Sequence, residues 1–366
     1  MGKYTAIDDP SAYFQTAIYT GNGGSDRAIV NDGNSAMQPD WVWYKSRSNA
    51  TSHITYDSSR GDGPYLKPSD TGDEGTDANM FESFDSDGFS LNGDTDGNGS
   101  GRTYVAWQWK CNGGTTSNLS GNLASVVQVN ATAGFSIVKY TGTGGNGQSV
   151  NHGLGLTPEV IITKSRNADQ SWHVYHKSIG NTKILKLDTT AAQASSSDYS
   201  AAAVNSTAFF VSTSLIYVGE LGADYVSYCF APIQGYSKFG KYVGTSVADG
   251  PFIYLGFQPA WVMIKRVDQG TTYSSWAMFD NQRRAYNPAG DTQSLYANRT
   301  YAEGKRGQGS ANSQEVRIDM LSNGFKVRDG GSDEINDAGD TYIYMAFAQH
   351  PFVSSTNTNS LPTTAR

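Results

Sequence analysis

The stretch Pro39-Asp40-Trp41-Val42-Trp43-Tyr44-Lys45 opens on proline, runs through apolar residues and closes on lysine. Nearly continuous apolar runs of this length are typical of central strands that are covered on both faces, and proline is tolerated at a first strand position because it need not donate a ladder hydrogen bond. The same pattern occurs twice more with identical spacing, as Pro158-Glu159-Val160-Ile161-Ile162-Thr163-Lys164 and Pro259-Ala260-Trp261-Val262-Met263-Ile264-Lys265. The chain is therefore predicted to contain the same buried strand in each of three repeats.

Other landmarks keep the same order around each copy of this strand. A tyrosine, with glycine two residues later, precedes the proline by 17 to 20 residues, at Tyr19, Tyr140 and Tyr242. After the strand come a leucine, a threonine and a glutamate or glutamine, and then an aromatic closing strand. These landmarks are Leu66, Thr71, Glu74 and Thr103–Trp107 in the first repeat, Leu185, Thr190, Gln193 and Asp224–Tyr228 in the second, and Leu295, Thr300, Glu303 and Thr341–Met345 in the third.

The composition indicates an all-β protein. The 366 residues include 41 Gly and 22 Tyr, and only 17% are charged, which favours strands and turns over helices. A chain of this length is too long for one ordinary core, and each repeat has the size of a single sandwich. We predict three tandem antiparallel β-sandwiches at 1–112, 135–235 and 236–353, a linker with one short strand (Ser125–Val129) at 113–134, and a polar C-terminal tail at 354–366.

Charge and hydropathy exclude several classes of function. The net charge of −7 argues against nucleic acid as a partner, because binding to phosphates needs a basic surface. No apolar stretch approaches the roughly 18 residues of a membrane helix, so membrane insertion is not expected. The two cysteines, Cys111 and Cys229, occupy inequivalent positions in the repeats, and we expect two unpaired thiols in a chain folded in a reducing cytoplasm.

Residues for catalysis are hard to find in the sequence. His173 and His176 form an H-x-x-H spacing, but an odd separation on a strand directs them to opposite faces, so we expect structural roles rather than a shared metal. The Glu-x-Asp-x-x-Glu string of laminarinase-like sandwiches is absent. A carboxylate pair brought together from separate loops stays open as an alternative, and the chain is predicted not to be an enzyme.

One segment resembles part of a calcium loop. Oxygen-bearing side chains alternate at Asp94, Asp96 and Asn98, and a glycine that permits a sharp turn precedes Asn98. The glutamate expected twelve positions along is replaced by Val105. A plain acidic hairpin loop is favoured over a weak Ca²⁺ site, and no other cofactor is expected.

Exposed aromatic residues are the remaining candidates for binding, because their rings stack on sugars and anchor interfaces. Most tyrosines and tryptophans fall in predicted strands, where packing explains them. Four tyrosines fall in predicted loops and are candidate contacts to a receptor or glycan: Tyr65, Tyr199, Tyr273 and Tyr301.

The chain resembles the repeats of phage tail and fibre proteins, a group of virion proteins common in marine tailed phages and often likened to concanavalin A-like lectin sandwiches. The resemblance spans nearly the whole chain, and no catalytic residues carry over with it. It rests on four stretches, which are Tyr4–Thr16, Ser171–His176, Gly235–Gly240 and Leu361–Arg366.

The resemblance implies jelly-roll or concanavalin-like sandwiches in a non-enzymatic structural protein of a bacteriophage particle, made in the cytoplasm of the bacterial host. A tail fibre or other tail-associated role in attachment to a host surface glycan is the favoured hypothesis. The alternatives are a capsid decoration or head-fibre protein and an enzyme that degrades polysaccharide. Expected partners are other virion proteins and further copies of the chain, with a trimer favoured and the sandwiches stacked into a rod or platform.

Overall fold

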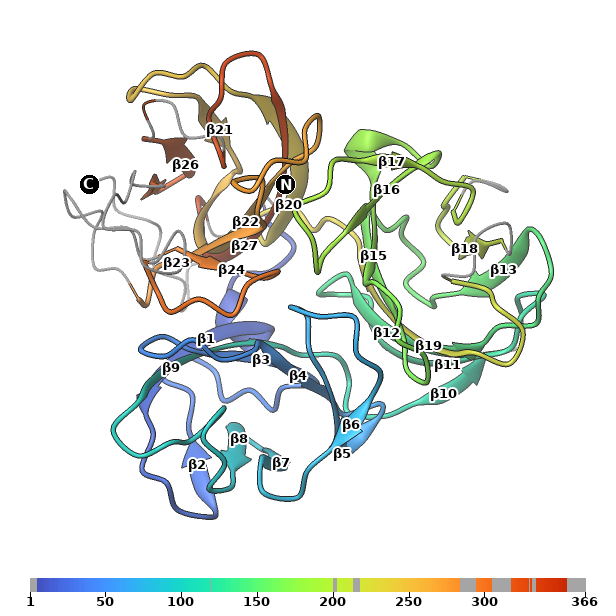
Figure 1. The fold of residues 1–366 in the computed structure, drawn as a ribbon, viewed down its shortest axis with the longest axis horizontal. Coiled ribbons are helices and arrows are strands. Elements are labelled where there is room, and N and C mark those ends of the chain that lie inside the picture. Colours follow the sequence, from blue (N-terminus) through green and yellow to red (C-terminus); the bar gives the residue numbers. More distant parts are fainter. Residues whose placement is uncertain are drawn as a thin grey trace.

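The computed structural model describes residues 5–118, 120–199, 203–212, 218–283, 294–304, 317–328, 330 and 334–353. The predicted all-β class is confirmed, because the strands form several antiparallel sheets. Helical structure in the described residues is limited to two short 3-10 turns, η1 (Pro10–Ala12) and η2 (Lys177–Ile179), and none of it is long and apolar enough to cross a membrane. Three lobes, one for each repeat, surround a common centre (Figure 1).

Lobe 1 holds the first repeat. Its large sheet has the strand order β1-β9-β3-β4-β5-β6 and its small sheet the order β2-β8-β7. The strands are β1 (Phe14–Thr20), β2 (Arg27–Ile29), β3 (Trp41–Ser46), β4 (Ile54–Asp57), β5 (Gly61–Leu66), β6 (Gly75–Thr76), β7 (Phe81–Asp85), β8 (Gly88–Leu91) and β9 (Thr103–Trp109).

Lobe 2 holds the second repeat and repeats this plan with two strands added to the large sheet and one strand fewer in the described part of the small sheet. Its large sheet has the order β10-β11-β12-β19-β14-β15-β16-β17, and β13 pairs with β18 in the small sheet. The strands are β10 (Thr116–Asn118), β11 (Ser125–Asn130), β12 (Phe135–Thr141), β13 (Gln148–Asn151), β14 (Val160–Ser165), β15 (His173–His176), β16 (Lys183–Lys186), β17 (Ala194–Ser195), β18 (Ala208–Val211) and β19 (Asp224–Phe230).

Lobe 3 holds the third repeat. Its large sheet has the order β20-β27-β22-β23-β24 and its small sheet the order β21-β26-β25. The strands are β20 (Ser237–Val243), β21 (Phe252–Tyr254), β22 (Phe257–Arg266), β23 (Ala277–Asp280), β24 (Leu295–Tyr296), β25 (Ile318–Leu321), β26 (Gly324–Val327) and β27 (Thr341–Pro351).

The segment at 113–134, predicted as a linker with a strand, carries both β10 and β11. β11 pairs with β12 along six residues, so this segment extends the large sheet of lobe 2. The predicted tail at 354–366 lies outside the described residues. Cys111 and Cys229 are buried free thiols, as predicted.

The repeated Tyr-x-Gly motif has the same role in each lobe. Its tyrosine pairs with the tyrosine of the closing strand, and the rings stack at 5.2 Å (Tyr19 and Tyr104), 5.1 Å (Tyr140 and Tyr225) and 5.2 Å (Tyr242 and Tyr342). The glycine then passes so close to a neighbouring loop that a Cβ atom would lie between 2.1 and 2.4 Å from a backbone oxygen in all three lobes. Only glycine fits, which explains why the motif recurs.

The three large sheets meet at the centre of the molecule. Trp109, Phe230 and Phe347 occupy equivalent positions in the three closing strands, five residues after the paired tyrosine. Their ring centroids form a triangle with sides of 6.5, 5.7 and 5.7 Å. Trp41 stacks on Tyr228 at 4.3 Å beside this triangle, and Trp109 meets Trp261 at 5.6 Å. The lobes therefore share one buried aromatic core, in addition to the core inside each sandwich.

A backbone hydrogen bond of the same kind closes each junction between lobes. The N–H of Glu74 donates to the carbonyl of Arg166 at 2.8 Å, that of Gln193 to Val267 at 2.9 Å, and that of Glu303 to Arg47 at 2.8 Å. Lobe 1 thus bonds to lobe 2, lobe 2 to lobe 3, and lobe 3 back to lobe 1. The repeats form a closed ring with pseudo-threefold symmetry and not a linear rod (Figure 1).

Candidate functional site

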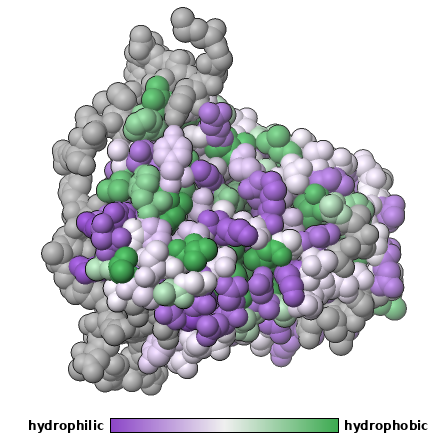
Figure 2. Space-filling view, turned by 90° about the horizontal axis from the view of Figure 1, so that it is seen from above, coloured by the Kyte–Doolittle hydropathy of each residue, from purple (hydrophilic) through white to green (hydrophobic). Residues whose placement is uncertain are grey.

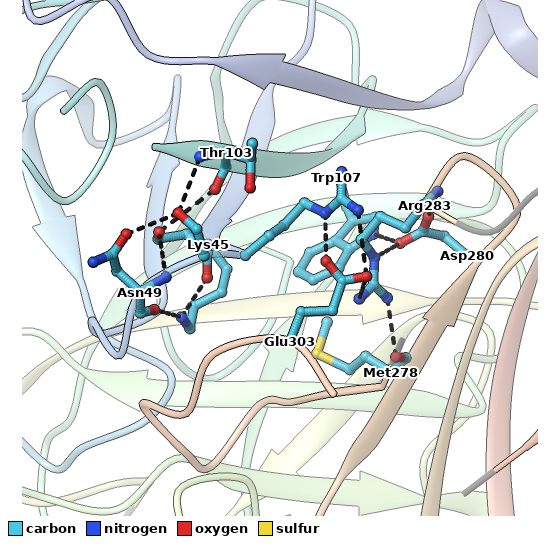
Figure 3. A network of polar contacts seen from close by, with 11 residues as sticks. Lys45, Asn49, Thr103, Trp107, Met278, Asp280, Arg283 and Glu303 are labelled. Atoms are coloured by element: carbon cyan, nitrogen blue, oxygen red, sulfur yellow. Dashed lines mark hydrogen bonds and ion pairs between the residues drawn. The ribbon is translucent and has the colours of Figure 1, made fainter. Parts of the chain in front are cut away.

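The junction between lobes 1 and 3 holds a network of charged side chains (Figure 3). Arg47, just after β3, forms an ion pair with Glu303 of lobe 3. Arg283 binds Asp280 at 2.6 Å and lies 3.7 Å from the same Glu303. The indole N–H of Trp107 donates to Asp280 at 2.9 Å, and the Arg283 guanidinium lies 5.6 Å from the centroid of the Trp107 ring. Every charge has an opposite partner, so the network joins the two lobes.

The junction between lobes 1 and 2 repeats this arrangement with equivalent residues. Arg166 binds Glu74 at 2.6 Å, and Arg60 lies 3.5 Å from the same glutamate. Arg60 also forms an ion pair with Asp57, and both of these side chains are fully buried. The hydroxyl of Tyr228 donates to Asp57 at 2.7 Å, in the place that Trp107 takes at the other junction.

The junction between lobes 2 and 3 lacks these charges. The positions equivalent to Asp57, Arg60 and Glu74 are occupied by His176, Ile179 and Gln193. Burial lowers the pKa of His176 to about 4, so the ring is neutral at physiological pH. Its Nδ1 accepts from the backbone of Ser178 at 3.1 Å, which leaves Nε2 to donate to the carbonyl of Tyr344 at 3.2 Å. A neutral hydrogen bond here replaces the ion pairs of the other junctions.

The lysine that ends each Pro-to-Lys strand is buried beside a junction. Lys45 donates to the carbonyls of Ser46 and, at 3.0 Å, Asn49, and Lys164 makes the same kind of bonds within its own loop. Lys265 donates across the junction to Thr190 at 3.3 Å. Burial lowers the pKa of all three, to about 7, 8 and 7 for Lys45, Lys164 and Lys265. These amines are bound to main-chain oxygens and are not presented to solvent.

The interior of lobe 2 contains a row of hydrogen-bonded polar residues. His173 Nδ1 lies 3.1 Å from Asp198, the Thr163 and Ser227 hydroxyls are 2.7 Å apart, and Tyr199 donates to Thr163 at 2.8 Å. Serine, histidine and aspartate are the residue types of a nucleophilic triad. All five side chains are fully buried, however, so a substrate has no access to them.

The H-x-x-H pair is divided between two environments, as predicted from its odd spacing. His173 faces the interior of lobe 2 and His176 faces lobe 3. In the described ranges, no group of three or more His, Cys, Asp or Glu side chains is placed to hold a metal ion.

The candidate calcium loop is held together by its own hydrogen bonds. Asp94 accepts from the backbone of Asp96 at 2.7 Å. The Asn98 amide is fully buried and binds Asn22 and the Gly24 carbonyl, the latter at 2.7 Å. Asn98 therefore joins two loops of lobe 1, which favours the structural interpretation of the segment. Calcium binding by Asp94, Asp96 and Asn98 stays a prediction.

The four candidate tyrosines differ in their exposure. The prediction is wrong for Tyr199, which is fully buried in lobe 2 and so has no surface for a receptor. Tyr65 in lobe 1 is half-buried, and Tyr301 in lobe 3 is half-buried beneath the guanidinium of Arg299, 5.6 Å from its ring centroid. Tyr273, also in lobe 3, is 44% exposed. A glycan contact by Tyr65, Tyr273 or Tyr301 stays a prediction.

The arginines of the junctions were missed in the sequence. Arg47 and Arg166 each stand two residues after the repeated lysine, and the third repeat has Val267 there. The partners change in the same way, because Arg47 pairs with Glu303 and Arg166 with Glu74, whereas Val267 lies at the junction with Gln193. Each pair joins two different repeats, so the sequence signal can be interpreted only in the folded ring.

A family model described as Domain of unknown function (DUF7483) matches residues 9–351. No curated protein and no solved structure matches the chain.

Proposed function

Because the chain belongs to the DUF7483 family, whose description assigns no activity, we propose from its own geometry that it is a non-enzymatic structural protein of a bacteriophage particle. The observation that carries this proposal is the closed ring of three lobes. Repeated backbone bonds, the ion pairs of Arg47 with Glu303 and of Arg166 with Glu74, and a shared aromatic core join the lobes. Such a body suits a rigid building block, because loops on its surface can vary without disturbing the core.

The polar residues support the same proposal. The described arginines and histidines of the junctions are bound to internal partners, and the Ser-His-Asp residue types in lobe 2 are enclosed. On the face seen in Figure 2, hydrophobic residues occur in small groups between hydrophilic ones. This pattern is typical of a soluble surface with local contact points.

We favour a tail-associated position, in which loops of the ring contact a glycan of the host surface. Immunogold labelling of intact particles tests it, with an antibody raised against the purified chain. Label on the tail is expected. Label confined to the head would replace the tail role by capsid decoration, and particles without label would contradict a structural role altogether.

Capsid decoration is the second candidate, and the pseudo-threefold symmetry of the ring favours it. A body with three similar lobes presents similar surfaces about one axis and so matches a threefold position of a shell. Degradation of a polysaccharide is the remaining alternative. Incubation of the purified chain with host envelope glycans should release no new reducing ends, and a steady release would overturn the non-enzymatic assignment.

A further inference from the structure

We call one side of each sandwich its flank. On this side the first strand of the repeat (β1, β12 or β20) runs beside the first strand of the small sheet (β2, β13 or β21). In lobe 2 the chain itself covers this flank. β11 pairs with the outer edge of β12 from Ser125 to Asn130, and Leu123 donates its N–H to Ser149 of the small sheet at 3.1 Å. The segment before the second repeat therefore closes the gap between the two sheets.

The same flank of lobe 1 is formed by β1 and β2. Thr103 of β9 lies opposite Thr20 of β1. The backbone groups of Thr103 point toward β3, where its carbonyl accepts from the N–H of Arg47 and its N–H donates to the hydroxyl of Ser48. Because backbone directions alternate along antiparallel strands, Thr16, Ile18 and Thr20 direct their N–H and C=O groups outward from the sheet. Within the described part of the chain, no strand pairs with this outer edge of β1.

The side chains of this edge differ from those of the other lobes. Ile18 is 45% exposed, and the neighbouring Val30 after β2 is 66% exposed. The equivalents of Ile18 are Lys139 and Lys241, and Lys139 pairs with Val126 of the covering strand β11, so this position is compatible with strand addition. β1 itself carries no charged residue.

A cleft of about 200 Å³ lies between the two strands of this flank, lined by residues of β1 and β2, by Val30 and Asp32 after β2, and by Gln282 of lobe 3. Two polar atoms of its lining, Thr16 Oγ1 and Arg27 Nε, are buried and form no hydrogen bond with any described residue. Unpartnered polar atoms of this kind are costly in a folded chain unless a ligand or water binds them. Together with the outward backbone of β1, they form a site that still lacks hydrogen-bond partners.

We propose that the flank of lobe 1 binds an extended strand donated by another polypeptide, which adds to the outer edge of β1. The chain shows the chemistry of such a strand in lobe 2, where the uncharged segment Ser125–Asn130 combines three valines with serine, glutamine and asparagine. Main-chain hydrogen bonds to Thr16 and Ile18 provide affinity, and Ile18 and Val30 pack against the apolar side chains. This inference goes beyond the proposed function, because it does not depend on the chain being part of a virus particle.

The test uses the full chain and a labelled synthetic peptide with the sequence of residues 122–131, titrated by fluorescence anisotropy. Saturable binding is expected, and Ile18→Pro should weaken it by about tenfold or more, because proline removes the outward N–H that an added strand needs. Val243→Pro is the matched control. It makes the same change at an exposed position of β20 in lobe 3 and should leave binding unchanged.

Hydrogen exchange measured by mass spectrometry locates the bound peptide. Exchange should slow in the part of β1 that contains Thr16 and Ile18. The proposal is overturned if no saturable binding occurs, if Ile18→Pro binds equally well, or if slowing is confined to β12, where the peptide would merely replace β11. Self-association of the chain that Ile18→Pro abolishes would also overturn it, in favour of a second copy as the occupant.

Discussion

At the scale of single residues, the junctions show how one position can be filled by different chemistry. Two junctions use a buried aspartate that accepts a hydrogen bond from Tyr228 or Trp107 of the next lobe. The third has Met345 at the position of those donors, and a methionine donates no hydrogen bond. His176 instead donates to a main-chain oxygen, so the acid of the other junctions is not needed there.

Asp57→Ala is expected to destabilise the ring strongly. Its carboxylate is fully buried, pairs with the buried Arg60 and accepts from Tyr228. Removal of one partner of a buried ion pair costs about 3 to 5 kcal/mol, because the other charge stays desolvated. The free energy of unfolding, measured by denaturant titration, checks this. Lys177→Ala is the control, since the exposed pair of Lys177 with Glu159 contributes no more than about 1 kcal/mol, and equal losses for both variants would contradict the argument.

The buried Lys265 predicts a pH dependence of stability. Burial lowers its pKa from 10.5 to about 7, so between these values the unfolded chain binds the additional proton. Stability therefore rises with pH across this window, by at most about 1.4 kcal/mol per pH unit from this group. The slope should decrease in Lys265→Met and stay unchanged in Lys241→Met, which alters an exposed lysine of β20. Unfolding measured at pH 7, 8.5 and 10 gives the slopes, and identical slopes in wild type and Lys265→Met would exclude a buried titrating amine.

At the scale of the elements, the Tyr-x-Gly motif ties the first strand of each large sheet to the loop before the closing strand. The tyrosine pair sets the register, and the glycine lets two backbones approach. The Pro-to-Lys strand then places its lysine at the start of the next loop, where the amine binds carbonyl oxygens.

Gly142→Ala is expected to disturb this contact in lobe 2. A Cβ atom at Gly142 would lie 2.2 Å from the carbonyl oxygen of Glu220, and a backbone atom cannot move aside as a side chain can. We expect a loss of about 1 to 3 kcal/mol, the usual cost of forcing extra volume into a packed site. Gly114→Ala, with open space around it, should have little effect on the unfolding midpoint, and a similar loss at both sites would refute the steric explanation.

At the scale of the whole molecule, the ring makes the lobes depend on one another. Lobe 1 contributes Trp41, Trp43, Trp107 and Trp109 to the central core, and all four are at most 1% exposed in the intact chain. A separated lobe would expose this surface to water, at a cost that three small sandwiches are poorly able to bear.

The intact chain is therefore expected to unfold in one cooperative transition. Tryptophan fluorescence reports mainly on the central core, whereas far-ultraviolet circular dichroism reports on all sheets, and the two midpoints should coincide. The fragment 1–112 expressed alone should be insoluble or unfolded. Separate transitions, or a folded and soluble fragment, would show that the repeats are independent domains.

The sequence by itself determined the repeats, the all-β class, the buried Pro-to-Lys strands, the free cysteines and the opposite orientation of His173 and His176. These features follow from local spacing, because side chains alternate along a strand and glycine and proline restrict the backbone. A repeated pattern does not say how its copies meet, however. The same sandwiches are compatible with a linear rod or a closed ring.

Only the tertiary structure decided that the ring closes, that Glu74 and Glu303 pair with arginines of other repeats, that Tyr199 is buried, and that the flank is covered in lobe 2 but open in lobe 1. Closure of the ring depends on contacts between residues far apart in the sequence, such as Arg47 and Glu303, which are 256 positions apart. Such contacts form because three apolar sheet faces must be removed from water together, and the packing that achieves this is a property of the folded chain as a whole.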